Sequence, residues 1–466
     1  MFATANELLN EHGTMLFNHL KAAVERSNKI ALPLAMDYKQ RQEFLFSRHD
    51  VSLYVHYPFC VHKCPYCDFA SITSCNDDER DRKYTDMLIK EFKSKVHLLG
   101  GRKLISLYIG GGTPSLCEPK DFDRLLEEVG PYLQDGAEIS LEANPGTIDL
   151  KRLCDLKAAG FNRISIGVQS FDEAMLKRLG RIHNKQEAID ACKNAIKAGF
   201  ENYNLDLMHG LPRQDAAQSL DDLKIALELE STHLSWYELT IEEDTAFGKK
   251  PPILPDEDVL YAIEQEGFEL LDKAGFEHYE VSGYNLGGKW RCLHNQNYWL
   301  YGDYLGIGAA AHQKITVLKD EYAQGKSHSV FSSVSELSKI VTALNCNNLD
   351  SINPYEIRRS ANSENYLEYF DACVKADMGP NLGTNEYTVV SDEEVPFEFM
   401  LNRLRMCIEP VSADEYLLHT GQSLTTLRPQ LESMAKKGLI KLESDLSFAL
   451  TDEGKIMVNE AIAEFL

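Results

Sequence analysis

The 466-residue sequence contains no run of about 18 apolar residues and no secretory leader in its first residues. The first absence excludes a membrane-spanning helix, and the segment Met1–Glu7 has neither a basic region nor an apolar stretch. The 11 cysteines are an odd number without regular pairing, which argues against a disulfide framework. We therefore expect reduced thiols and a cytoplasmic protein.

Basic residues are scarce relative to acidic ones. The chain has 48 Lys and Arg against 72 Asp and Glu, a formal net charge of −24. Such a charge repels phosphate backbones and anionic lipid, so we expect no nucleic-acid partner. The hydrophobic content of 44% is ample for a large core, and the length suggests two or three domains.

Three cysteines lie within eight residues, Cys60, Cys64 and Cys67, directly after an apolar run. A [4Fe–4S] cluster usually takes four thiolates, so a Cys-x3-Cys-x2-Cys loop leaves one iron for a ligand that is not protein. The amino and carboxylate groups of S-adenosylmethionine (SAM) suit that position. The alternatives are a zinc site completed by His62 or His56, or cysteines that merely lie close together. Zinc loops more often use two separate Cys-x2-Cys elements, and the sequence has no second pair.

Short apolar strands alternate with amphipathic helices through the middle of the chain. The strands are predicted at Leu53–Tyr57, Ile105–Ile109, Glu138–Glu142, Arg163–Gly167, Tyr203–Leu207 and His233–Tyr237. The helices between them are predicted at Asp81–Leu98, Pro119–Leu133, Lys151–Ala159, Lys185–Ala198 and Ala216–Leu229. Alternation of this kind is typical of a parallel sheet with right-handed crossovers. Six units predict an α/β fold, a partial (β/α)6 TIM-like barrel whose site lies at the carboxyl ends of the strands.

Residues suited to binding a ligand follow several of these strands. The glycine-rich run Gly110–Ser115 comes after the second strand, where missing side chains let backbone groups approach a ligand closely. It lacks the Gly-Lys-Ser/Thr element of a P-loop. Glu142 ends the third strand, Gln169 follows the fourth, Arg181 lies beyond it, and Asp206 ends the fifth. Polar groups that end successive parallel strands are expected to point into one mouth of the barrel.

Together these segments resemble the radical SAM superfamily. The cysteine loop, Gly-Gly-Gly-Thr-Pro, Leu-Glu-Ala-Asn-Pro and Asn-Leu-Asp-Leu are similar to the branch that includes oxygen-independent coproporphyrinogen III oxidase, and within it most similar to the HemW-type heme chaperones. The resemblance implies a [4Fe–4S] cluster held by Cys60, Cys64 and Cys67. It also implies SAM contacts, with Arg181 at the SAM carboxylate, from Tyr54, Gly111, Gly112, Thr113, Glu142, Gln169, Arg181 and Asp206.

Two features separate the chaperones from the oxidase. The oxidase has an additional cysteine two residues after the triad, where this chain has Phe69, and this departure counts against oxidase activity. The second feature is the hexapeptide His-Asn-Gln-Asn-Tyr-Trp at 294–299, which matches the His-Asn-x-x-Tyr-Trp heme motif of the HemW group. By that resemblance, His294 ligates heme iron.

The remaining roles in heme binding are less specific. The resemblance implies that the rings of Tyr298 and Trp299 pack on the porphyrin. Cys292 and His312 are alternative axial ligands, and the sequence does not rank them.

Outside the barrel, the sequence divides into three further regions. The barrel with the heme motif is predicted to span residues 49–315. Before it, residues 1–48 are predicted to be a helical extension with an amphipathic helix at Ala5–Glu25. Residues 316–394 form a predicted variable insertion or linker. Within it, residues 326–365 include 15 Ser or Asn, which suggests a surface insertion in which Ser335–Leu344 could be helical.

Residues 395–466 are predicted to form a helical, winged-helix-like domain. The pattern is two helices, then a strand at Gly438–Leu442, a turn, a second strand and a last helix. Pro396–Leu466 has 7 basic and 11 acidic residues, the wrong balance for phosphate contacts. A cover for the open barrel or a docking surface for clients is the expected role.

The resemblance thus implies a heme chaperone that uses a [4Fe–4S] cluster and SAM and delivers heme to client respiratory proteins. It also predicts an electron donor for the cluster and peripheral membrane association only through clients. The rival is a radical enzyme acting on a tetrapyrrole, either a coproporphyrinogen III oxidase or an anaerobic heme-degrading enzyme. The sequence leaves open whether SAM is cleaved and which oligomer forms.

Overall fold

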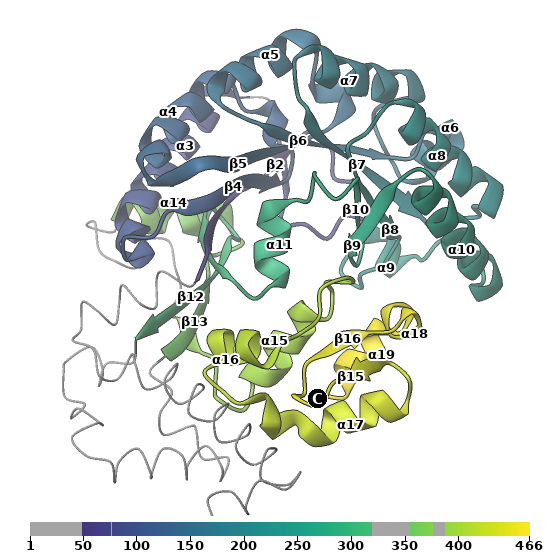
Figure 1. The fold of residues 1–466 in the computed structure, drawn as a ribbon. Helices are drawn as coiled ribbons and strands as arrows, with labels where there is room; N and C mark the ends of the chain where they lie inside the picture. Colours follow the sequence, from purple (N-terminus) through teal and green to yellow (C-terminus); the bar gives the residue numbers. More distant parts are fainter. Residues whose placement is uncertain (1–48, 76, 319–354, 376–386) are drawn as a thin grey trace, which may run out of the picture.

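A computed structural model describes residues 49–75, 77–318, 355–375 and 387–466. The predicted helices at Ala5–Glu25 and Ser335–Leu344 lie outside the described residues. Figure 1 shows an arc of strands with helices along its outer side. Among the described residues, no helix is long and apolar enough to cross a membrane.

Six parallel strands form the centre of the fold and confirm the predicted barrel. They are β1 (Val51–Tyr57), β4 (Leu104–Gly111), β5 (Leu133–Ala143), β6 (Arg163–Gln169), β7 (Asn202–His209) and β8 (His233–Glu238), adjacent in that order. The main outer helices are α3 (Asp78–Lys95), α4 (Pro119–Val129), α5 (Leu150–Ala159), α7 (Lys185–Lys197), α8 (Ala216–Glu228) and α10 (Glu257–Lys273). The short helices α6 (Glu173–Arg178) and α9 (Ala246–Lys249) complete the connections.

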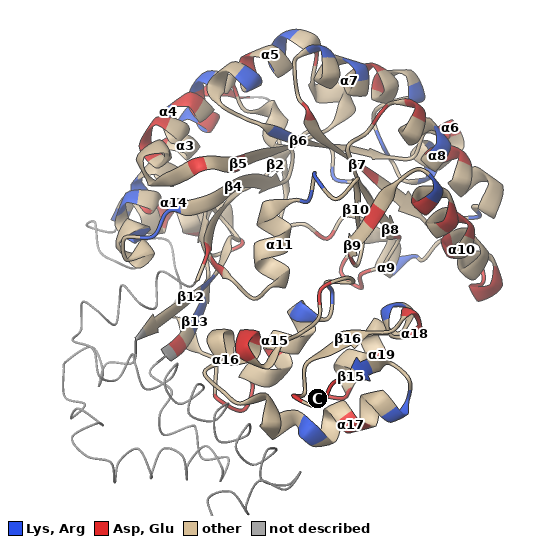
Figure 2. Cartoon of the chain, in the orientation of Figure 1, with Lys and Arg blue, Asp and Glu red and all other residues tan. Residues whose placement is uncertain are grey.

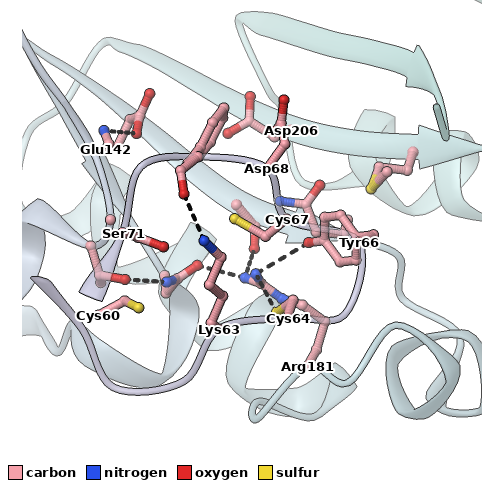
Figure 3. A pocket seen from close by; sticks show the side chains of 18 of the residues that line it. Cys60, Lys63, Cys64, Tyr66, Cys67, Asp68, Ser71, Glu142, Arg181 and Asp206 are labelled. Carbon is pink, nitrogen blue, oxygen red and sulfur yellow. Dashed lines mark hydrogen bonds between the residues drawn. The ribbon is translucent and has the colours of Figure 1, made fainter. Parts of the chain in front are cut away.

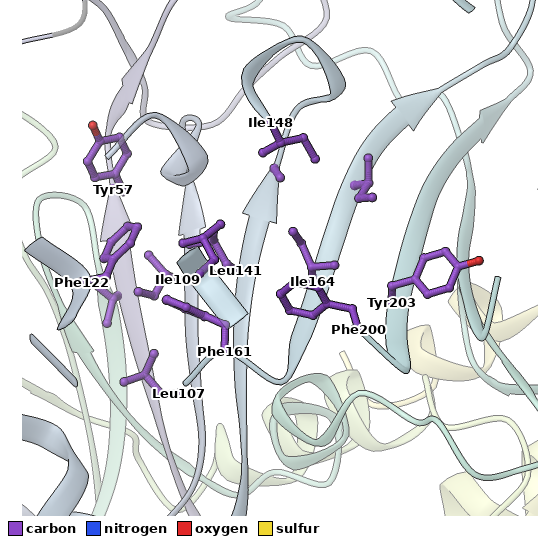
Figure 4. Close-up of a cluster of buried hydrophobic side chains, with 14 of the residues drawn as sticks. Tyr57, Leu107, Ile109, Phe122, Leu141, Ile148, Phe161, Ile164, Phe200 and Tyr203 are labelled. Atoms are coloured by element: carbon purple, nitrogen blue, oxygen red, sulfur yellow. The ribbon is translucent and has the colours of Figure 1, made fainter. Parts of the chain in front are cut away.

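Side chains alternate between the two faces of each central strand, as strand geometry requires. One face is apolar and packs under the outer helices, for example Leu107 and Ile109 of β4 beneath Phe122 of α4, all at most 1% exposed (Figure 4). Figure 2 shows that Lys, Arg, Asp and Glu gather mostly on the outer helices. The opposite face of the strands turns into the barrel and carries polar and aromatic residues such as Ser106 and Tyr108.

Further strands extend the sheet at both edges. On one side, β11 (Asp303–Ile307) runs parallel to β1, and β12 (His312–Leu318), β13 (Tyr355–Ala361) and β14 (Thr388–Val389) follow antiparallel. On the other side, β10 (Gly283–Leu286) and β9 (Phe276–Glu280) follow β8. The helix α14 (Tyr366–Lys375) packs on α3.

These edge strands correct one expectation. The prediction of a surface insertion at residues 326–365 is wrong for Tyr355–Ala361, because β13 pairs with β12 along its whole length. The Ser- and Asn-rich composition did not show that β13 has a partner far away in the sequence. The predicted boundary between residues 315 and 316 also falls inside β12.

The C-terminal region has the helices and the two-stranded hairpin that the sequence predicts. Its elements are α15 (Val395–Arg403), α16 (Ala413–Thr420), α17 (Arg428–Lys436), β15 (Ile440–Leu442), β16 (Phe448–Leu450), α18 (Asp452–Ile456) and α19 (Val458–Ala463). It has its own apolar core, which includes Phe399 and Leu431. Backbone hydrogen bonds from Val281 to Arg405 and from Cys407 to Tyr279 join it to β9 and the residues after it.

A buried carboxylate connects β11 to its neighbours. Asp303 is fully buried and lies 2.7 Å from Arg102 Nη1 and 3.2 Å from Lys314 Nζ, and it accepts a hydrogen bond from Thr316 Oγ1 at 2.8 Å. The two cations hold the pKa of Asp303 well below its usual range. Since the folded-state pKa is depressed, this contribution to stability is complete above the unfolded pKa of about 4 and is lost as the pH falls toward the folded value.

We predict that Asp303→Asn lowers the free energy of unfolding at pH 7 by about 3–5 kcal/mol, because it leaves two buried cations without their anion. Urea unfolding followed by circular dichroism measures this change. The control is Asp155→Asn, which removes the exposed partner of Lys151 and should cost less than about 0.5 kcal/mol. Equal stability of Asp303→Asn and the parent would show that the buried cluster does not contribute.

Candidate cofactor site

A cavity of about 390 Å³ opens at the carboxyl ends of the central strands. Its volume is in the range of about 300–1,000 Å³ typical of small-ligand sites. Figure 3 shows side chains from the cysteine loop and from several strand ends pointing toward it. All three triad cysteines line it, as do seven of the eight predicted SAM residues: Gly111, Gly112, Thr113, Glu142, Gln169, Arg181 and Asp206.

The cysteine loop follows β1 and is held at both of its ends. Cys60 ends the short strand β2 (Phe59–Cys60), which pairs with β3 (Ile72–Thr73) where the chain leaves the loop. Inside the loop, the Cys67 amide donates to the Cys64 carbonyl at 3.1 Å, and Lys63 Nζ donates to the Phe69 carbonyl at 3.0 Å. The loop is therefore folded on its own backbone contacts, with three sulfurs along one wall of the cavity.

The glycine run packs closely against the cysteine loop, a role that the sequence did not show. The Gly112 amide donates to the Tyr57 carbonyl at 2.7 Å, and a Cβ at Gly112 would come within 2.6 Å of the Phe59 carbonyl oxygen. A Cβ at Gly111, where φ is +114°, would come within 2.6 Å of the His56 ring. The missing side chains let this run approach the chain's own cysteine loop, while Gly111 and Gly112 also line the cavity.

Two carboxylates lie on the strand ends across the cavity. Glu142 accepts hydrogen bonds from Tyr108 Oη at 2.9 Å and from the Gly111 amide at 3.0 Å. Burial and the nearby Asp206 raise the pKa of Glu142 to about 7. Burial also raises the pKa of Asp206, which accepts from Ser165 Oγ at 3.0 Å and Asn204 Nδ2 at 2.7 Å. Two buried acids in one cavity, both with raised pKa values, favour a cationic ligand, because a positive charge stabilises the ionised carboxylates.

The Arg181 guanidinium lies at the boundary between the cavity and the cysteine loop. It donates to Asn144 Oδ1 at 2.5 Å and to the Gly167 carbonyl at 2.6 Å, and its Nη1 is 3.8 Å from Cys64 Sγ. Its buried Nε has no hydrogen-bond partner in the part of the chain that the structure describes. A guanidinium in this position stabilises negative charge on the sulfur and leaves one donor for an anionic ligand group.

Gln169 carries backbone strain at the end of β6. Its φ of +69° is in the left-handed region, which residues other than glycine adopt rarely. The side-chain oxygen accepts from Tyr237 Oη at 2.9 Å, which fixes the amide at the cavity wall. Strain of this kind occurs most often at binding sites.

The eighth predicted SAM residue, Tyr54, does not line the cavity. It lies one layer deeper in the barrel, where its ring is 6.5 Å from Tyr108 and 6.1 Å from His294, measured between centroids. Its hydroxyl is 3.0 Å from His56 Nδ1. The aromatic group expected beside the cluster connects to the cysteine loop through His56, whose Nε2 is 2.8 Å from the Ala70 carbonyl.

The predicted heme motif forms α11 (Leu293–Trp299), which Figure 1 shows inside the arc of strands. The His294 ring stacks on Tyr108 with centroids 4.9 Å apart, and its Nδ1 is 3.2 Å from Ser106 Oγ. Burial and the charge of Arg163 lower the pKa of His294 to about 3, so the imidazole is neutral at pH 7. Its Nε2 has no hydrogen-bond partner among the described residues.

The other candidate heme residues lie in different surroundings. Tyr298 is 37% exposed, and Trp299 donates from Nε1 to Glu280 at 3.1 Å. Cys292 is fully buried, its Sγ lies 3.5 Å from Glu138, and burial raises its pKa to about 12, which keeps the thiol protonated. His312 begins β12 and is exposed. Of the three candidate axial ligands, His294 is the one that combines a neutral imidazole with a place in the motif.

Several cavity residues escaped the sequence analysis, among them Asn144, Met208, Tyr237 and Glu238. Met208 and Tyr237 lie near the ends of β7 and β8, Glu238 ends β8, and Asn144 directly follows β5. Period-two alternation, counted from Asp206 and Ser235, could have found Met208 and Tyr237.

Among the residues that the structure describes, no group of three or more His, Cys, Asp or Glu side chains converges to hold a single metal ion. A [4Fe–4S] cluster does not require such convergence, because each thiolate binds a different iron. At this cavity, three sulfurs face two carboxylates and an arginine. These side chains fit a [4Fe–4S] cluster with a charged ligand beside it.

Comparison with known proteins agrees with this geometry. The signature of the Radical SAM superfamily matches residues 54–223. The heme chaperone HemW of Escherichia coli is 39% identical over 89% of this chain and 98% of its own length, and that of Haemophilus influenzae is 38% identical with the same coverage. The solved structure of Escherichia coli coproporphyrinogen III oxidase (HemN), described as a radical SAM enzyme, superposes with a TM-score of 0.70 at 21% identity, over 91% of this chain and 93% of that one.

We predict that anaerobically reconstituted protein binds about four irons and four sulfides per chain. The triple variant Cys60→Ala, Cys64→Ala, Cys67→Ala should bind almost none, because the loop that lines the cavity loses all its thiolates. Iron and sulfide analysis checks this. The control replaces the exposed Cys75 and Cys154 and should keep the full content. A full cluster in the triple variant would assign the ligands to other cysteines.

Proposed function

The chain belongs to the HemW family of radical SAM proteins, and we propose that it is a heme chaperone that binds heme and passes it to client proteins. The observation that carries this proposal is His294, a neutral imidazole with a free ring nitrogen, in a chain that is similar to HemW proteins along nearly their whole length. Neutral imidazole is the form that ligates heme iron.

The cavity supports a [4Fe–4S] cluster on Cys60, Cys64 and Cys67 with SAM beside it. In this proposal, Glu142 and Asp206 face the cationic groups of SAM, and Arg181 offers its free Nε to the SAM carboxylate. When bound, the cluster and SAM supply one-electron chemistry. The residues of the chain hold the cofactors, with Gln169 and Tyr237 fixing the opposite wall. An electron donor for the cluster belongs to the proposal.

The proposed heme site involves α11. His294 supplies the axial ligand, and Tyr298, four residues later, lies on the same face of the helix with part of its ring exposed. Trp299 is held by Glu280 and contacts Tyr298 edge to face at 5.0 Å. These two rings are proposed to pack on the porphyrin.

A tetrapyrrole-modifying radical enzyme is the less favoured alternative. The likeness to coproporphyrinogen III oxidase is one of fold. Phe69, where that oxidase would have an additional cysteine, is 54% exposed beside the cavity. The proposal therefore assigns the cofactors to a chaperone.

His294→Ala is expected to weaken heme binding at least about tenfold, equivalent to about 1.4 kcal/mol, and to shift the Soret band, because the variant loses an axial ligand. Spectrophotometric heme titration measures both effects. The control His97→Ala removes an exposed histidine and should leave both unchanged. An unaltered spectrum and affinity in His294→Ala would exclude this ligand and point to His312. A parent that does not bind heme would contradict the chaperone function.

SAM affinity is expected to rise with pH, by up to about tenfold per unit below pH 7, and to level off above it. The reason is that Glu142, with its pKa raised to about 7, must lose its proton to meet a cationic ligand. Calorimetric titration of the reconstituted protein between pH 6 and 8 measures this slope. In Glu142→Gln the slope should be reduced, and an unchanged slope would show that another group controls binding.

A further inference from the structure

Four rings form a layer that runs from the cofactor cavity to α11 and includes one ring of that helix. We call this set, Tyr54, His56, Tyr108 and His294, the aromatic layer. Tyr108 stacks on His294 with an interplanar angle of 26° and on Tyr54 with one of 21°. Tyr54 also contacts His56, at 6.0 Å between centroids. The rings come from β1, β4 and α11, so the layer joins both ends of the barrel interior.

The upper side of the aromatic layer is bonded to the cofactor site at two points. Tyr108 Oη donates to Glu142 Oε1, and the other oxygen of this carboxylate accepts from the Gly111 amide. His56 donates from Nε2 to the Ala70 carbonyl, which can only accept, so His56 Nδ1 accepts from the Tyr54 hydroxyl. The hydrogen bond of Tyr108 therefore connects the aromatic layer to the cavity wall, and that of His56 connects it to the cysteine loop.

The lower side of the layer holds the heme motif in place. The carboxylate of Glu138 accepts from the amides of Leu293 at 3.0 Å and His294 at 3.3 Å, and Asn297 Nδ2 donates to Ser52 Oγ at 3.0 Å. The His294 ring lies between Ser106 and Tyr108. A movement of the His294 ring would therefore change its stacking on Tyr108.

We propose that Tyr108 is a positioning residue that couples the cofactor cavity to His294, so that SAM and heme raise each other's affinity. A ligand that donates to Glu142 Oε1 competes with the Tyr108 hydroxyl for this acceptor and weakens their hydrogen bond. The Tyr108 ring can then shift, and His294 can leave the stack to reach iron. This coupling rests on the proposed heme-binding function and adds to it a link between the two sites. Linkage requires the effect to be equal in both directions.

The test is a heme titration of the cluster-reconstituted protein with and without saturating SAM. In the parent, SAM is expected to tighten heme binding about fivefold or more. Tyr108→Phe keeps the ring and removes the hydroxyl, so its heme affinity without SAM should match that of the SAM-saturated parent and should not respond to SAM. The Soret band should stay as in the parent, because His294 remains the ligand.

The matched control is Tyr279→Phe. Tyr279 is also buried and also loses one hydroxyl, which accepts from the Cys292 amide at 3.0 Å and lies 2.9 Å from His233. This variant breaks a separate connection to the start of α11 and should keep the parent's response to SAM. Thermal unfolding of both variants checks that the fold is retained. The reciprocal measurement, SAM affinity with and without heme in the parent, should give the same factor.

The outcomes separate the two proposals. A parent that binds heme equally well with and without SAM overturns the coupling and leaves the chaperone function standing. A full SAM response in Tyr108→Phe, or its loss in Tyr279→Phe alone, also overturns the role of Tyr108. A parent that binds no heme under any condition overturns the proposed function, and the coupling with it.

Discussion

The period-two alternation of side chains along the six central strands is the constraint on which the rest of the structure depends. It places Leu107, Ile109 and their counterparts under the outer helices and turns Ser106, Tyr108 and Glu142 into the barrel. Neighbouring parallel strands are in register, so inward-facing groups from different strands meet at the same height. The barrel interior thus contains, one after another, the cofactor cavity, the aromatic layer and the residues that hold α11.

The interior is unusual in its electrostatics. Acidic groups at both levels, Glu142 above and Glu138 below, are compensated by few cations, chiefly the buried Arg163 and Arg181. At the upper level, burial raises the pKa of both Glu142 and Asp206, so a bound cation would stabilise their ionised forms. At the lower level Glu138 is satisfied by the amides of α11, so its charge stabilises the folded protein.

Much of the fold and of the candidate site could be predicted from the sequence, because the sequence patterns that indicate them are local. Strand and helix positions followed from periodicity, and the cysteine triad followed from spacing within eight residues. The SAM residues and the heme motif came from resemblance, and seven of the eight SAM residues line one cavity. The features that the sequence did not show depend on residues far away in the chain. The role of Gly112 depends on Phe59, that of Tyr54 on His56 and His294, and β13 exists as a strand because β12 pairs with it.

The central proposal is that this barrel holds the cluster and SAM so that the protein can deliver heme. Its most direct test is anaerobic transfer of heme from the loaded, cluster-reconstituted protein to the apo form of a heme-requiring respiratory protein, followed by the acceptor's absorption spectrum. The acceptor is expected to gain its holo spectrum while this chain loses its heme, and His294→Ala is expected to transfer far less. Heme that stays bound in the presence of acceptor, cofactors and reductant would contradict this proposal.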